Sequence, residues 1–347
     1  MQIILAILVF CVIIIIHELG HFTAAKLCGI QVNEFALGMG PVIFRIQGKE
    51  TAYVIRLLPI GGSVMMEGED AQSDNPRAFN RKPVWQRMIV IVAGAVMNLI
   101  LGYIIVVWSL ALPDTVIAST TISYFQEDAV SSNYLNEDDE ILSIDGTTVF
   151  TASDIIYKLQ NSDTKNEDGN LIYDIKVRRN GEALLLEDVE FEHRQSEDGA
   201  SSIYFDFKVY SRQKTVPTVL AEGFKESVST GRLVIMSLVD ILRGKYGLND
   251  LSGPVGVVNV VSQSVSYGLS TFLGIASLIT INVGVFNLLP VPALDGCRFV
   301  FLIIEAIRRK PLKPEVEGMV HFAGLALLML LMLVVTFNDI SKLIAGG

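Results

Sequence analysis

The sequence predicts a multi-pass α-helical membrane protein that carries an inserted, water-soluble α/β domain. Hydrophobic residues make up 51% of the 347 residues and charged residues only 18%, below the ~25% typical of soluble domains. A helix needs about 20 apolar residues to cross a bilayer, and four stretches qualify: 3–27, 88–112, 273–294 and 319–337. Residues 113–215 hold 21 acidic and 9 basic side chains, a balance of −12, whereas the rest of the chain is +2 and the whole chain −10. The acidic balance excludes a typical nucleic-acid-binding protein.

The first stretch is expected to be a membrane span rather than a cleaved signal peptide, because Met1 and Gln2 provide no basic residues before it. After it, Val42, Phe44 and Ile46 alternate with polar or small residues, and so do Tyr53, Ile55 and Leu57. This period of two on both sides of Gln47-Gly48-Lys49 predicts a β-hairpin.

Lys and Arg in short loops mark the cytoplasmic side of a membrane protein. They are concentrated between the first two spans and after the third, at Lys26, Arg45, Lys49, Arg56, Arg77, Arg81, Lys82, Arg87, Arg308, Arg309, Lys310 and Lys313. We therefore expect a cell-membrane protein whose two termini and acidic domain lie outside the cytoplasm, and whose hairpin lies on the cytoplasmic side.

The segment after the acidic domain contains a short apolar run, Leu233 to Leu242, flanked by Arg232 and Arg243. Ten residues do not span a bilayer, so a surface-lying or re-entrant helix is expected. The chain is thus predicted to divide into 1–112 with two spans and the hairpin, 113–214 as the extracytoplasmic domain, 215–268 with the amphipathic or re-entrant helix, and 269–347 with the last two spans.

The first span contains the motif His17-Glu18-Leu19-Gly20-His21. Histidines four residues apart lie on one face of a helix and can bind one Zn²⁺, while Glu18 can act as general base on a water at the metal. Ionisable side chains in hydrocarbon each cost ~2.5 kcal/mol or more and are retained mainly for function. The motif therefore predicts a catalytic zinc site inside the membrane.

A catalytic zinc site has three protein ligands, and Asp295 at the end of the third apolar run is the expected third ligand. Two alternatives stay open: Asp295 as the cap of the helix that follows it, and Cys297 as a thiolate ligand. The prolines 290 and 292 break the helix before Asp295. Asn287 lies one turn before Pro290 and could donate to the carbonyl of a bound peptide, or bond to its own helix or to a neighbouring one.

Together these elements make the chain resemble the site-2 protease family of intramembrane zinc metallopeptidases, of the bacterial regulator of sigma-E protease type. The matching motifs are His17–His21, the N-x-x-P-x-P-x-L-D-G run 287–296, Ser252-Gly253-Pro254-Val255-Gly256, and Gly61-Gly62 followed by Gly68-Glu69. The resemblance implies that His17, His21 and Asp295 bind zinc and that Glu18 is the general base. It further implies a membrane re-entrant β-loop at 34–62 and a substrate site at Asn287, Pro290, Pro292, Gly61 and Gly62.

Within the acidic domain, residues 129–149 resemble a PDZ domain, followed by a helix-like 151–159 and a strand-like 171–178. Tyr134 and Asp138 replace the usual glycines, and no peptide-carboxylate loop is evident at 120–125. A single PDZ-like domain that sterically gates the membrane site is therefore as plausible as one that binds carboxyl termini.

The expected function is an intramembrane zinc endopeptidase acting on single-span membrane proteins, such as an anti-sigma factor or a signal-peptide remnant. The hairpin is expected either to offer an unpaired edge near Ile55 and Leu57, to which substrate adds as a strand, or merely to cap the cytoplasmic face. The alternatives for the whole protein are a catalytically inactive membrane scaffold with a PDZ-like domain and a metal transporter. The complete His, Glu, His and Asp set argues against the scaffold.

Overall fold

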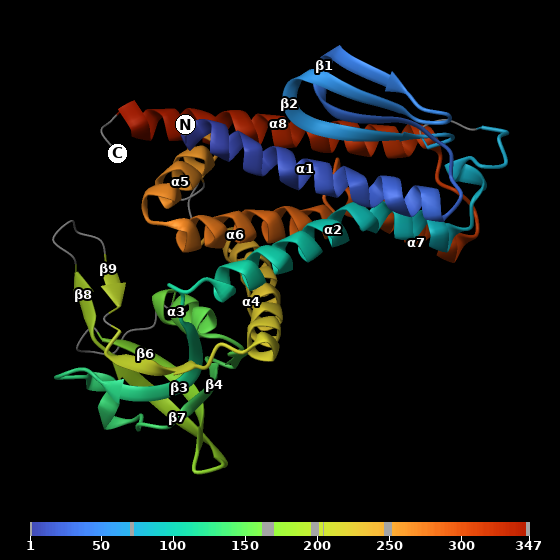
Figure 1. Ribbon diagram of the computed structural model, residues 1–347. Coiled ribbons are helices and arrows are strands. Elements are labelled where there is room, and N and C mark those ends of the chain that lie inside the picture. Colours follow the sequence, from blue (N-terminus) through green and yellow to red (C-terminus); the bar gives the residue numbers. More distant parts are fainter. Residues whose placement is uncertain are drawn as a thin grey trace. The chain divides into compact units, whose positions relative to one another are not determined.

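The computed structural model describes residues 2–69, 73–161, 170–195, 201–203, 205–245 and 252–344. The chain forms two compact units (Figure 1). One consists of Met1–Ile105 together with Val234–Gly347, and the other of Val106–Leu233. The first unit contains the predicted zinc motif, so it is described first.

Four helices of the described chain are long and apolar enough to cross a membrane, as the sequence predicts. They are α1 (Gln2–Leu27), α2 (Val84–Ala111), α6 (Leu269–Leu288) and α8 (Pro314–Ile344). Large apolar side chains such as Phe322 and Leu333 on α8 are 75% and 65% exposed. An apolar surface of this kind is stable in lipid and unfavourable in water. The chain is a membrane protein with an inserted β-rich domain.

Glycines bring these helices close together. A Cβ on Gly20 of α1 would lie 2.9 Å from the Cα of Gly94 on α2, and one on Gly284 of α6 would lie 2.9 Å from Leu99 on α2. Such separations leave no room for a side chain, so both contacts depend on glycine. Helix α2 thus packs against α1 and α6, the two helices that carry the predicted motifs.

The predicted hairpin is present as β1 (Val32–Gln47) and β2 (Ala52–Met66), which pair in antiparallel fashion. Bulges divide each long strand in two. Residues 32–37 pair with 62–66 on one side and with 52–55 on the other. Residues 42–47 pair with the other side of 52–56. The outer edges of this sheet are therefore 42–47 and 62–66. The expectation of an open edge at Ile55 is wrong, because Ile55 pairs with both Leu37 and Phe44.

The turn of the hairpin is tied to the end of α1. Lys26 donates to Glu50 at 2.6 Å and to Thr51 at 2.9 Å, and Arg77 donates to Glu50 at 2.9 Å. These hydrogen bonds from Arg77 and Lys26 lower the pKa of Glu50 to about 2. The hairpin consequently has a fixed attachment to the helix that bears the zinc motif.

Three further helices complete the first unit or lead into it: α4 (Val216–Leu242), α5 (Pro254–Ser266) and α7 (Asp295–Arg308). Residues 233–242 are helical, as expected, but they form the end of the longer helix α4. Residues 246–251 of the predicted 215–268 segment lie outside the described residues. Helix α5 begins after Gly253, whose N–H and that of Gly256 donate to the buried carboxylate of Asp339 on α8. A carboxylate at a helix N-terminus is favourable, so the Ser-Gly-Pro-Val-Gly motif anchors α5 to α8.

The second unit is a mixed α/β domain around one sheet. Its strands are β3 (Ile117–Phe125), β4 (Glu140–Ile144), β5 (Thr147–Thr148), β6 (Leu171–Arg179), β7 (Glu182–Phe191) and β10 (Phe207–Arg212). The order is β10-β3-β4-β6-β7, with β5 beside β4. The separate strands β8 (His193–Gln195) and β9 (Ser201–Ile203) pair with each other. The predicted strand at 171–178 is confirmed.

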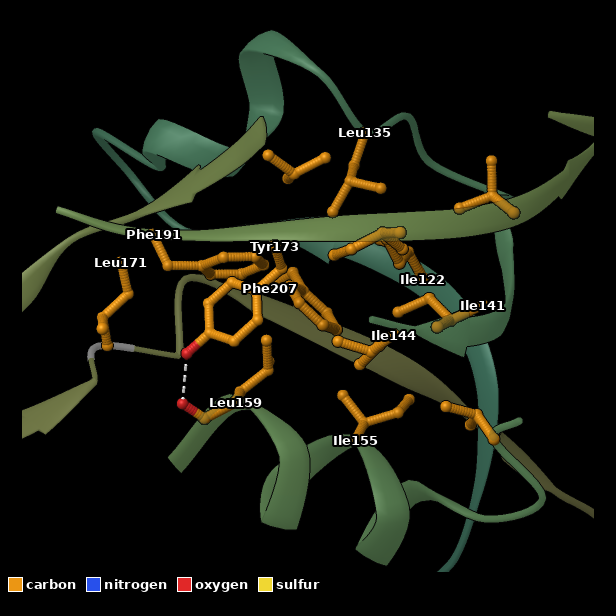
Figure 2. Packing of buried hydrophobic residues seen from close by; sticks show 14 residues of the cluster. Ile122, Leu135, Ile141, Ile144, Ile155, Leu159, Leu171, Tyr173, Phe191 and Phe207 are labelled. Atoms are coloured by element: carbon orange, nitrogen blue, oxygen red, sulfur yellow. Dashed lines mark hydrogen bonds between the residues drawn. The ribbon is translucent and has the colours of Figure 1, made fainter. Parts of the chain in front are cut away.

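The core of this domain lies between the sheet and helix α3 (Ala152–Gln160), which confirms the helix expected at 151–159. Figure 2 shows Leu159 of α3 next to the ring of Tyr173 and Ile155 of α3 opposite Ile144 of β4. The hydroxyl of Tyr173 donates to the carbonyl oxygen of Leu159, so even the polar end of this buried ring is satisfied (Figure 2).

Candidate metal centre

Helix α1 holds His17 and His21 one turn apart, and their rings meet edge to face with centroids 4.8 Å apart. The Nδ1 of His21 lies 2.8 Å from the carbonyl oxygen of Val90 on α2. A carbonyl can only accept, so His21 donates from Nδ1 and keeps a lone pair on Nε2. This is the arrangement that a metal-binding histidine adopts.

Asp295 reaches the same point from a different part of the chain. Helix α6 ends at Leu288, earlier than the predicted end of the third span at 294, and the residues up to Leu294 are not helical. Ala293 has a φ of +77° in this bend, and its N–H donates to Nδ1 of His321 at 3.1 Å. Helix α7 then begins with Asp295 itself. The N-cap residue of α7 is Leu294, which makes no side-chain capping hydrogen bond. The alternative in which Asp295 caps this helix is therefore wrong.

The three side chains converge on one point. Oδ2 of Asp295 lies 3.2 Å from Nε2 of both His17 and His21, and these two nitrogens are 3.2 Å apart. Oδ2 is buried and accepts no hydrogen bond within the described residues. Lone pairs that face one another so closely repel unless a cation lies between them. Two imidazoles and one carboxylate are a ligand set of catalytic Zn²⁺, so the residues fit the predicted ion.

The alternative ligand Cys297 does not belong to this group. The cluster of potential metal ligands in the described chain comprises His17, His21 and Asp295, with ligand atoms within 4.8 Å of one another. Cys297 is a buried free thiol two residues further along α7. The thiolate alternative is therefore not supported by the geometry.

Glu18 lies beside these three side chains in a cavity of about 550 Å³. The cavity is lined by His17, Glu18, His21 and Asp295, by the sheet edge 62–66 and by the residues that follow this edge up to Glu69. We call residues 62–66 the cavity edge. A Cβ on Gly62 would lie 2.6 Å from Cγ of Glu18. The absence of a side chain at Gly62 therefore lets the hairpin approach the carboxylate.

The other predicted substrate residues lie outside this cavity lining. Asn287 donates to the carbonyl oxygen of Val283 on its own helix at 3.0 Å. Pro292 packs against Gly324 of α8, because a Cβ on Gly324 would lie 2.8 Å from the backbone of Pro292. Pro290 follows the end of α6. Gly61 lines a separate, smaller cavity with Cys11 and Leu37.

Sequence reasoning missed two residues that shape the site. Arg298 forms an ion pair with Glu69 at the cavity wall and lies one turn after Asp295. His321 holds the bend before Asp295 through Ala293. Gly94 also shapes the site, and its signal in the sequence is the small-residue pair Ala93-Gly94, which lets the second span pack closely.

Gly94 is expected to be essential for metal binding. A Cβ at this position would lie 2.8 Å from Cε1 of His17 and closer still to Nε2 of His21. Overpacking of this kind costs roughly 1–3 kcal/mol, so Gly94→Ala should weaken zinc binding by about 5- to 150-fold. Zinc titration of the purified protein against a chelator measures this.

Gly274→Ala is the matched control, because nothing lies within 4 Å of a Cβ on Gly274, also in a membrane-spanning helix. Equal zinc affinity of the two variants would show that Gly94 does not shape the site.

Two histidines one turn apart and a glutamate on one helix, a carboxylate from a second segment and a cavity beside membrane-spanning helices are the features of a membrane-embedded metalloprotease. The model of peptidase family M50 matches residues 5–331, and the chain belongs to this family, the site-2 proteases. It is an intramembrane zinc metalloendopeptidase of regulated intramembrane proteolysis. The sequence-based function and cofactor are confirmed, and the inactive scaffold is not favoured.

Several bacterial proteins are similar to the chain over almost its whole length. A protein of Clostridium acetobutylicum, provisionally named a zinc metalloprotease, is 36% identical over 98% of this chain and 97% of its own. The regulator of sigma-W protease RasP of Bacillus subtilis is 30% identical over 97% of both chains, and the zinc metalloprotease RasP of Shouchella clausii 31% over 96% and 97%. The alignment with the Bacillus protein runs over 423 positions. That relative therefore contains residues for which this 347-residue chain has no counterpart.

Proposed function

We propose that His17, His21 and Asp295 hold the catalytic zinc and that Glu18 is the general base. The observation that carries this proposal is the convergence of three ligand atoms at 3.2 Å with Glu18 in the same cavity. When bound, zinc would supply a Lewis acid that polarises the peptide carbonyl and makes water easier to deprotonate. The protein groups then carry out the proton transfers.

Glu18 is placed to take the proton from the attacking water, because its side chain opens into the cavity and is not one of the converging ligands. The same carboxyl can return that proton to the amine that leaves when the peptide bond breaks. Val90 keeps His21 in the required orientation. The chain's own residues thus account for ligation, water activation and leaving-group protonation.

The cavity edge is the proposed binding site for the unwound substrate. Residues 62–66 pair with 32–37 on one side only within the described sheet, and their other side borders the cavity with Glu18. An extended peptide can add to such an edge and satisfy its backbone hydrogen bonds there. We therefore propose strand addition at the cavity edge, close to the proposed ligands, instead of near Ile55 and Leu57.

Proline substitutions test this edge. Backbone N–H groups of a strand point alternately to its two sides. Of the two single variants Ser63→Pro and Val64→Pro, one therefore removes a hydrogen bond within the sheet and the other removes a free donor at the edge. We expect the variant that removes the free donor to lose at least about tenfold in cleavage of a membrane-embedded substrate while it retains zinc, since one backbone hydrogen bond is worth roughly 1 kcal/mol and proline also blocks close approach.

Arg45→Pro, on the opposite edge of the sheet, is the control. Full cleavage by both variants at 63 and 64, or an equal loss with Arg45→Pro, would contradict substrate pairing at the cavity edge.

We also propose that the hairpin enters the membrane from the cytoplasmic side and that the second unit is a single PDZ-like domain outside the cytoplasm. The basic loops support this orientation. The sheet and α3 of the second unit are compatible with the PDZ assignment of 113–214. Residues 120–125 lie in strand β3, so no carboxylate-binding loop lies there. This favours a steric gate over a receptor for carboxyl termini.

The substrates are membrane-embedded proteins, and we propose single-span proteins, either an anti-sigma factor or a signal-peptide remnant. The name of the Bacillus relative, a regulator of sigma-W protease, supports the first class. Comparison of membrane peptides from cells with the wild type and with Glu18→Gln tests this. Accumulation of trimmed single-span fragments is expected with the variant, and accumulation of multi-span proteins alone would contradict the proposed class.

A further inference from the structure

Helix α2 presents one stripe of residues, four positions apart, to the histidines of α1. Val90 accepts the hydrogen bond of His21, Gly94 leaves space for both rings, and Asn98 lies 3.3 Å from Nδ1 of His17. Since the order along α2 is the reverse of that along α1, the two helices are antiparallel here. Each proposed zinc-ligating ring therefore has its own partner on the same face of α2.

Asn98 is fully buried, with 0% of its surface exposed. Its amide nitrogen faces His17, while its amide oxygen has no hydrogen-bond partner within the described residues. A half turn of the amide exchanges its two atoms, so that the oxygen accepts a hydrogen bond from Nδ1 of His17 and the NH2 group takes the position without a partner. One end of the amide is unpaired in either orientation, so the His17 ring decides between them.

The half turn matches the chemistry of the ring. If the amide nitrogen donates to Nδ1, the proton of a neutral His17 lies on Nε2. Nε2 faces His21 and Asp295. A protonated Nε2 has no lone pair and could not bind a metal there. If the amide oxygen accepts from Nδ1, the lone pair lies on Nε2, as it does in His21.

We propose that Asn98 is a positioning residue, whose amide oxygen accepts from Nδ1 of His17 and directs Nε2 toward the metal. This inference rests on the proposed ligand set. A group that hydrogen-bonds to the second ring nitrogen of a metal-ligating histidine typically raises the metal affinity 10- to 100-fold. Asn98 and the carbonyl of Val90 would together fix both imidazoles.

The experiment compares Asn98→Leu and Asn98→Asp in the purified full-length protein in detergent. Zn²⁺ affinity is measured by competition with a chelator, and the ligand field by the visible spectrum of bound Co²⁺. Asn98→Leu should weaken Zn²⁺ binding about 10- to 100-fold and alter the Co²⁺ spectrum. Asn98→Asp should retain at least wild-type affinity, because a carboxylate can only accept and holds metal-ligating histidines well.

Loss of affinity in Asn98→Asp equal to that in Asn98→Leu would overturn the proposal, because it would show that the amide donates. Wild-type affinity in Asn98→Leu would overturn it as well. Should Asn98→Leu not fold, the affinity of Asn98→Asp decides alone. Thr280→Val is the control: Thr280 is fully buried and bonds to Ala276 of its own helix, so this variant should bind Zn²⁺ like the wild type.

His17→Ala separates this inference from the proposed ligand set. Unchanged Zn²⁺ affinity in His17→Ala would show that the ligand assignment itself is wrong. Loss of affinity in His17→Ala together with unchanged affinity in Asn98→Leu would contradict only the role of Asn98.

Discussion

Glu18→Gln is expected to abolish proteolysis while the protein keeps its zinc. Glutamine has nearly the same size as glutamate but cannot take a proton from water, and a positioned general base contributes about 10²- to 10⁴-fold. Glu18 is not among the three converging ligands, so the metal content should not change. Cleavage of a membrane-embedded reporter, with zinc quantified in the same sample, measures both quantities.

Glu140→Gln is the matched control for this variant. Glu140 forms an ion pair with Arg178 on the sheet of the second unit and does not line the zinc cavity. The control should cleave at the wild-type rate. Wild-type cleavage by Glu18→Gln would exclude Glu18 as the base, and loss of zinc with cleavage would show that Glu18 supports the metal instead.

Asp295→Asn should release the zinc, which makes it the second variant with a large expected effect. The carboxylate is the only negative ligand in the cluster of the described chain, and its Oδ2 faces both imidazole nitrogens. Loss of a ligand should lower the metal affinity by more than the 10- to 100-fold that results from losing a group hydrogen-bonded to a ligand. We therefore expect zinc affinity to fall by more than about 100-fold and proteolysis to be lost.

Metal analysis of the purified variant after dialysis against a weak chelator tests this prediction. Asp339→Asn is the control, because Asp339 is also a buried carboxylate of the first unit but accepts N–H groups at the start of α5. Stoichiometric zinc in Asp295→Asn, or equal zinc loss in Asp339→Asn, would contradict the ligand assignment.

The helical spans and the zinc motif could be predicted because both depend on local sequence. Four apolar runs are enough to predict four helices. The spacing of His17 and His21 determines that they share a face of any helix. Pro290 and Pro292 also predict the end of α6, although the helix stops before the first of them rather than at Leu294.

The edges of the β-sheet could not be predicted, because alternation of residues predicts strands but not their neighbours. The bulges in β1 and β2 turn one hairpin into four paired segments and place Ile55 in the interior. Likewise, Leu233 to Leu242 has the length of a short helix by itself, and only the structure joins it to the residues from Val216 onward.

The sequence by itself determined the membrane class, the metal and the reaction type, since these follow from hydropathy and from side chains a few residues apart. The sequence also indicated Asp295 as the third ligand. The tertiary structure decided which groups support the two histidines, because Val90, Gly94 and Asn98 meet the motif only through helix packing. Asn98 and His17 are 81 positions apart in the chain. Contacts over such distances depend on how whole helices approach one another, which local sequence patterns do not encode.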